Sequence, residues 1–206
     1  MINYLILGSV YAFAAAVQPG PLQAYLISQT LTNGWRRTVF ASFAPLLSDG
    51  PIIILVLFIL SHFSVGFIQV LQSIGGIFLL YLAYGAFKTW RNYNPNKEVV
   101  IQSTQQTIFK ATFVNLLNPN PYLGWSLVMG PLLLKSWHES PMNGIILLVS
   151  FYFTMIFFTA CIVLLFAAAK NLGQKVNKIL IGISVIALAS FGIYQLWLGI
   201  ISYYYN

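Results

Sequence analysis

Two short proline-containing segments interrupt otherwise apolar stretches of the chain, one hundred residues apart. The first reads Gln18-Pro19-Gly20-Pro21 and the second reads Asn118-Pro119-Asn120-Pro121. Because each proline lacks a backbone donor and clashes with the preceding turn, two prolines in three residues are expected to break a helix rather than bend it. A helix that restarts near Pro21 or Pro121 would present free N–H groups at its positive end, which suits a carboxylate or another anion.

Side-chain amides surround both breaks and give them further hydrogen-bonding capacity. We therefore expect the breaks to bracket one substrate path. A single proline kink often shapes only packing, and that alternative also applies here. The candidate substrate-binding residues are Gln18, Pro19, Gly20, Pro21, Gln23, Asp49, Asn115, Asn118, Pro119, Asn120 and Pro121.

Asp49 is the only acidic residue inside any apolar stretch. An unpaired carboxylate near the bilayer centre costs several kcal/mol, so it must be protonated, hydrated or close to a cation. No Lys or Arg lies at a comparable depth in the sequence. We predict that Asp49 exchanges a proton or meets a cationic ligand, which makes it the candidate proton-coupling residue. The alternative is a neutral Asp49 that is hydrogen-bonded to the broken backbone.

The composition identifies the class of protein. Of 206 residues, 59% are apolar and 6% are charged, and the mean hydropathy is +0.81. These values predict an integral membrane protein and exclude a soluble enzyme. The net charge of +7 does not indicate nucleic-acid binding, because the Lys and Arg residues lie between apolar runs, where they set orientation. We expect no cofactor and no metal site, since His62 and His138 are isolated at helix ends.

Six apolar runs are long enough to cross the membrane. Because lipid offers no hydrogen-bond partner to the backbone, they predict an all-α protein with six transmembrane helices. Three helices in each half give an inverted 3+3 repeat, with the first and fourth helices broken. Residues 1–91 form the first repeat, 92–107 a cytoplasmic linker and 108–206 the second repeat. The expected spans are 2–31, 39–60, 65–87, 108–134, 142–169 and 179–202.

Six spans divide the positive residues unequally between the two sides of the membrane. One side carries nine Lys and Arg, among them Arg36 and Arg37, whereas the other carries only Lys135. The positive-inside rule therefore places both termini and the loops near 61–64 and 135–141 outside the cytoplasm. The expected location is the cell membrane, with lipid around the helices. The sequence leaves a homodimer open.

With these motifs the chain resembles the lysine exporter (LysE/RhtB) family of amino-acid efflux proteins. The resemblance covers essentially the whole length and rests on four groups of residues. Its fourth-span motif departs from the family at Asn120, where lysine is frequent. The matching residues are Pro19-Gly20-Pro21, Asn33-Gly34-Trp35-Arg36-Arg37, Asp49, and Asn115-Leu116-Leu117-Asn118-Pro119.

The resemblance implies an inverted three-plus-three fold and efflux of amino acids or related metabolites, driven by the proton motive force. The resulting hypothesis is a secondary active exporter of a small amine-bearing metabolite, an amino acid first of all. A passive channel or facilitator is the alternative from another class. A metal-ion exporter would want several acids or histidines in the spans, where only Asp49 is present. An intramembrane enzyme would need a base and a nucleophile, and none is visible.

Overall fold

The computed structural model describes residues 1–59, 65–93, 102–170 and 173–204, and these residues form helices and short connections. The predicted loop at 61–64, His62 and half of the predicted linker, residues 94–101, lie outside the described residues. The all-α prediction is confirmed for the part of the chain that the structure describes.

The first predicted span is two helices. Helix α1 (Ile2–Val17) ends before Gln18, and α2 (Pro21–Asn33) begins with a proline at its first position. The axes of α1 and α2 differ by 62°. Gly34 then adopts a positive φ of 88°, which favours glycine, and separates α2 from the single turn α3 (Trp35–Thr38). The predicted break in the first span is confirmed.

The second and third predicted spans are helical over nearly their whole expected length. A 3₁₀ segment (Val39–Phe43) leads into α4 (Ala44–Ile59), which carries Asp49 and contains Pro51. Helix α5 (Val65–Arg91) follows and ends with basic residues in its last turn.

The fourth predicted span is broken, also as predicted. Helix α6 (Thr104–Leu116) begins four residues before the apolar run, because Ser103 and Gln106 form a capping box at its start. After the break come α7 (Pro119–Gly124), a π-helical turn (Trp125–Met129) and α8 (Gly130–Glu139). Two long helices, α9 (Pro141–Lys170) and α10 (Gln174–Tyr204), complete the described chain.

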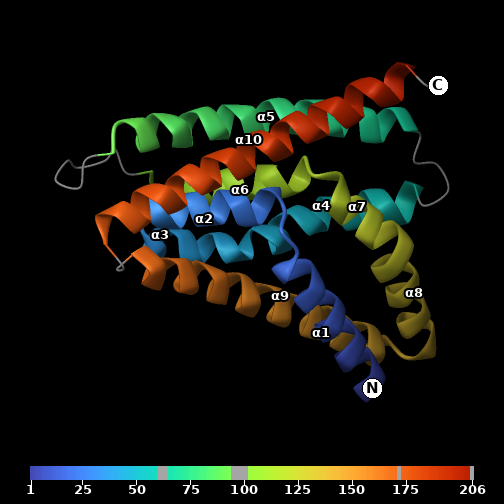
Figure 1. Ribbon diagram of the computed structural model, residues 1–206. Coiled ribbons are helices and arrows are strands. Elements are labelled where there is room, and N and C mark those ends of the chain that lie inside the picture. The colour runs from blue at the N-terminus through green and yellow to red at the C-terminus, as the bar shows by residue number, and fades with distance from the viewer. Residues whose placement is uncertain (60–64, 94–101, 171–172, 205–206) are drawn as a thin grey trace.

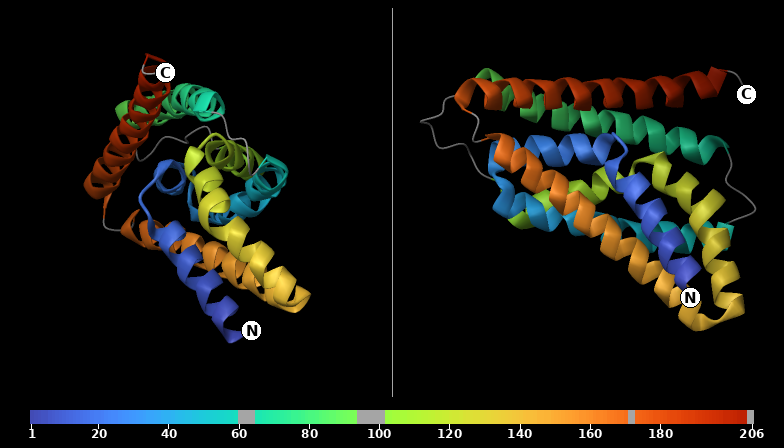
Figure 2. Two further views of the ribbon diagram at one scale, coloured as in Figure 1. Left: turned by 90° about the vertical axis from the view of Figure 1, so that its right-hand side faces the viewer. Right: turned by 60° about the horizontal axis from the view of Figure 1, so that its bottom comes forward.

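Three groups of helices lie beside one another (Figures 1 and 2). Helices α5 and α10 form a pair along one side, α2, α4 and α6 lie in the middle, and α1, α8 and α9 lie on the other side. Helix α1 approaches α9 closely at Gly8, where a Cβ atom would lie 2.6 Å from the Leu147 carbonyl oxygen. The strip formed by Gly8, Ala12 and Ala16 is buried, as small residues at helix contacts in bilayers are.

Within the described part of the chain, three helical segments are long and apolar enough to cross a membrane: Trp35–Val56, Pro141–Ala169 and Gln174–Ile201. The bent pair α1 and α2 raises the number to as many as four if it counts as one span. Helix α5 and the α6 to α8 series lie where the third and fourth spans were predicted, but they do not satisfy the same criterion in the described residues. The six-span count and the inverted repeat therefore stay predictions.

Candidate functional site

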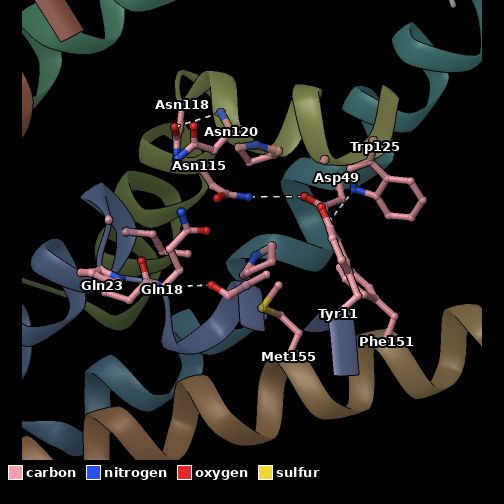
Figure 3. Close-up of a pocket in the computed structure, with 17 residues that line it drawn as sticks. Tyr11, Gln18, Gln23, Asp49, Asn115, Asn118, Asn120, Trp125, Phe151 and Met155 are labelled. Carbon is pink, nitrogen blue, oxygen red and sulfur yellow. Dashed lines mark hydrogen bonds between the residues drawn. The ribbon is translucent and has the colours of Figure 1, made fainter. Parts of the chain in front are cut away.

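Both helix breaks line one cavity of about 110 Å³ (Figure 3). This volume is below the roughly 300–1,000 Å³ of sites for drug-sized ligands, so the cavity suits a small metabolite. Among its lining residues, Gln18 and Asn120 are exposed, whereas Asp49 is only 3% exposed. The two exposed amides therefore lie at the mouth and the carboxylate lies deep. The cavity is lined by Tyr11, Ala15, Gln18, Pro19, Gly20, Leu22, Gln23, Pro45, Asp49, Asn115, Asn118, Asn120, Pro121, Gly124, Trp125, Phe151 and Met155.

The structure brings nine of the eleven predicted site residues together in this lining. The other two, Pro21 and Pro119, do not line the cavity. Each is buried at the first position of its helix, α2 or α7, where a proline loses no hydrogen bond. These two prolines end the preceding helix and start the next one, and they do so without facing the cavity.

At the first break, Gln23 replaces backbone donors that α1 loses. The Ala15 carbonyl would normally accept from residue 19, but Pro19 has no N–H. The Gln23 amide donates from Nε2 to the Ala16 carbonyl at 3.0 Å and reaches the Ala15 carbonyl at 3.5 Å. Thus a side chain of α2 satisfies the last turn of α1 and holds the two half-helices at their angle.

At the second break, Tyr122 does the equivalent work for α6. Its hydroxyl donates to the Leu116 carbonyl at 2.9 Å. The backbone N–H of Asn120, which would bond Leu116 in a continuous helix, instead donates to Asn118 Oδ1 at 3.1 Å. Each break therefore supplies its own replacement partner from the helix that follows.

The second half-helix begins at Pro119, so Pro121 lies in its first turn, as predicted, and Asn118 caps it. The cap occupies the Asn120 N–H, so this one group of the first turn is not a free donor for a ligand. At the first break Gly20 provides no side-chain cap, and Leu22 and Gln23 of the first turn of α2 line the cavity.

Asp49 accepts three hydrogen bonds, all from neutral donors. Asn115 Nδ2 donates to Oδ1 at 3.3 Å. The Trp125 indole and the Tyr152 hydroxyl donate to Oδ2 at 3.2 and 3.4 Å. Asn115 also donates to the Ser48 hydroxyl oxygen at 2.7 Å. Among the described residues the cavity lining contains no Lys, Arg or His.

The donor from Trp125 belongs to the π-helical turn. Trp125 is the first residue of that turn, and it is 3% exposed. A π turn rotates the residues that follow it and is often found at functional sites. In this protein it lies directly after α7, so that the helix from the second break delivers an indole N–H to a carboxylate on α4 (Figure 3).

Aromatic residues form the wall of the cavity beside Asp49, a feature that sequence reasoning missed. Tyr11 stacks on Phe151 with ring centroids 6.1 Å apart, and Trp125 meets Phe151 edge-on at 5.7 Å. The faces of aromatic rings attract cations. The helical periodicity of α1 and α9 does not reveal which aromatic residues face inward, because both helices are apolar all round.

The cavity consequently has two chemically different sides (Figure 3). The carboxylate and the aromatic rings attract a positive group. The opposite side presents the amides of Gln18, Asn118 and Asn120, which can donate hydrogen bonds to an anionic group, whereas the Asn115 amide is bonded to Ser48 and Asp49. A small zwitterion, with its ammonium toward Asp49 and its carboxylate toward the amides, is complementary to this arrangement.

Comparison with known proteins agrees with this chemistry. The model of the LysE type translocator family matches residues 13–199. A protein of Bacillus subtilis (strain 168) that carries the name "Putative amino acid efflux protein YcgF" is 25% identical over 207 residues, which cover 97% of this chain and 96% of that protein. No solved structure matches the chain. Because the family match extends over far more than half of its length, the chain belongs to the LysE type translocator family.

Proposed function

We propose that this protein is a secondary active exporter of an amino acid or a closely related amine, coupled to the proton motive force. The observation that carries the proposal is the single cavity in which both helix breaks meet Asp49. Membership of a translocator family and the amino-acid efflux named for its Bacillus relative support the same substrate class.

The surroundings of Asp49 suit a carboxylate that changes protonation state. When ionised, it can accept from all three neutral donors. When protonated, it needs an acceptor for its own proton, and the Tyr152 hydroxyl, 3.4 Å away, can reverse its hydrogen bond to become one. The Trp125 indole can only donate, and both the ionised and the protonated Asp49 retain an oxygen lone pair that can accept from it. In both states the Asp49 carboxyl group keeps hydrogen-bond partners among these side chains.

In the proposed cycle the ammonium of the substrate and a proton compete for Asp49. A proton that enters from outside displaces the amine outward, and release of that proton inside prepares the site for another substrate molecule. The matched breaks support an inverted repeat of residues 1–91 and 108–206 joined by the 92–107 linker, since paired broken helices mark the central site of such transporters.

The distribution of basic segments supports the proposed orientation. Helix α3, the basic last turn of α5 and the start of α10 lie toward one end of the molecule, and both termini lie toward the other (Figure 1). We propose that the basic end faces the cytoplasm and that both termini are outside it.

Uphill movement separates export from passive flow. In inverted vesicles with an acidic lumen, we expect the amino acid that expressing cells release in excess to accumulate above its outside concentration. A protonophore should abolish that accumulation, because it removes the gradient that drives it. Accumulation that stops at equal concentrations in both compartments would instead identify a channel.

Replacement of the carboxylate tests the coupling role. Asp49→Asn preserves size but cannot carry charge, and a hydrogen bond to a charged group contributes about 1.5–3 kcal/mol, so binding of the amine should weaken by about tenfold or more. Proton-driven accumulation should be lost, while downhill exchange of substrate persists. Glu139→Gln, the same change at an exposed acid outside the cavity, is the matched control. Full uphill transport by a well-inserted Asp49→Asn protein would place coupling elsewhere.

Reporter fusions test the orientation. A reporter that is active only in the cytoplasm should be active near residue 96 and inactive after residue 206, because positive loops stay inside. A reporter that is active only outside should give the complementary result. The reverse pattern in both series would contradict the proposed sides.

A further inference from the structure

A second cavity, with a volume of about 290 Å³, lies between α2, α5 and α6. It is separate from the Asp49 cavity and shares no lining residue with it. Polar side chains from α2, from α6 and from Gln102 just before α6 line it together with residues of α5. The polar groups that matter below are Ser28, Gln29, Asn33, Gln102 and Lys110.

Two of these groups are buried without a partner in the described structure. Ser28 is 1% exposed, and its hydroxyl makes no hydrogen bond. The Oε1 atom of Gln102 is buried and has no donor either. Buried polar atoms without a partner are uncommon, and each calls for an explanation such as a ligand. Asn33 links α2 to the segment before α6: its side-chain amide donates to Gln29 Oε1, and its Oδ1 accepts from the Gln102 backbone N–H at 3.4 Å.

Lys110 gives this cavity a positive charge. It is half-buried on α6, and no acidic residue is found in the described lining. The Lys110 ammonium, the unpaired Ser28 hydroxyl and the side-chain amides of the lining are hydrogen-bond donors, and such a set favours an anion. A carboxylate can accept hydrogen bonds from donors of all three kinds. The unpaired Gln102 oxygen adds an acceptor, which matches a ligand that also carries a positive group.

The two cavities lie at successive positions along the same two helices. On α2, the first is lined by Gln23 and the second by Ser28, about 7.5 Å apart along the helix axis at 1.5 Å per residue. Between them, fully buried Tyr25 packs in a cluster that includes Ala111 of α6. The Tyr25 hydroxyl donates to the Thr107 carbonyl at 3.4 Å, so this layer joins α2 to α6.

We infer that the second cavity is an additional binding site for a carboxylate-bearing amine, with Lys110 as the counter-charge of the carboxylate. It lies toward the basic end of the molecule, one buried layer away from the Asp49 cavity. The ligand class rests on the proposed function, whereas the site itself rests on its own unpaired groups. In an exporter it would receive the substrate before the Tyr25 layer opens.

Protection of Lys110 from reductive methylation tests this inference on the purified, membrane-embedded protein. The probes are betaine, which is a zwitterion without a reactive amine, acetate, tetramethylammonium and inorganic phosphate, all at equal ionic strength. By mass action, a probe at about twice its Kd should slow methylation about threefold. We expect betaine and acetate to protect Lys110, and tetramethylammonium not to. Lys135, exposed on α8, is the internal control and should react at an unchanged rate.

Ser28→Ala distinguishes binding from a structural role. Removal of an unpaired hydroxyl should leave the melting temperature unchanged or higher, while the protection by betaine falls. Absence of protection at Lys110, equal protection at Lys135, or stronger protection by phosphate than by acetate would overturn the inference.

The Asp49→Asn protein separates this site from the proposed function, because its Lys110 protection should equal that of the wild-type protein. Protection of Lys110 without uphill export would support the second site and contradict the exporter proposal. Uphill export without protection of Lys110 would support the exporter proposal and contradict the second site.

Discussion

The backbone groups that two helix breaks release inside an apolar bundle determine how the cavity is built. Lipid offers such groups no partner, so they must be satisfied by protein or face a polar space, and each buried group left without a partner costs about 1–3 kcal/mol. Gln23 and Tyr122 satisfy the freed carbonyls of α1 and α6. The same hydrogen bonds set the angle at which each half-helix continues. The opening between the half-helices is therefore a consequence of how the breaks are stabilised.

Asp49 joins the two halves of the chain through this opening. It belongs to α4, yet its hydrogen-bond donors come from α6, from the π turn after α7 and from α9. These contacts cross from the first half of the sequence to the second, between residues 66 to 103 positions apart. A change in charge at Asp49 would alter all three contacts at once. Ligand or proton binding at one carboxylate can thus influence the packing of both halves.

The breaks and Asp49 could be predicted from the sequence because their causes are local. A proline removes a donor wherever it occurs, and a lone acid in an apolar run needs a reason to be there. The second half-helix starts within two residues of Pro121, and the Asn118 cap sets its first residue at Pro119. The cap also takes up the Asn120 N–H, which proline positions alone do not reveal. Nothing local distinguishes the inward aromatics of α1 and α9, which are apolar on every face.

Tertiary packing and an irregular turn account for the rest of the site. Trp125 reaches Asp49 from the first residue of the π turn that follows α7. Gly124 leaves room for Tyr11 in the cavity wall, because a Cβ at that position would collide with the Tyr11 hydroxyl. Such a coincidence of register and small residue carries no periodic pattern. The second cavity was equally invisible, since its lining combines α2 and α5 with residues before α6.

The central claim, that both breaks enclose one ligand, is tested most directly by cysteine protection. In a Cys161→Ser background, single cysteines at Gln18 and Asn120 place one thiol on each break, and Glu139→Cys places a control thiol outside the cavity. The rate of alkylation is measured with and without the exported amino acid. The account predicts that the amino acid slows alkylation at both breaks by a similar factor and leaves position 139 unaffected. Protection at one break only, or at neither, would contradict it.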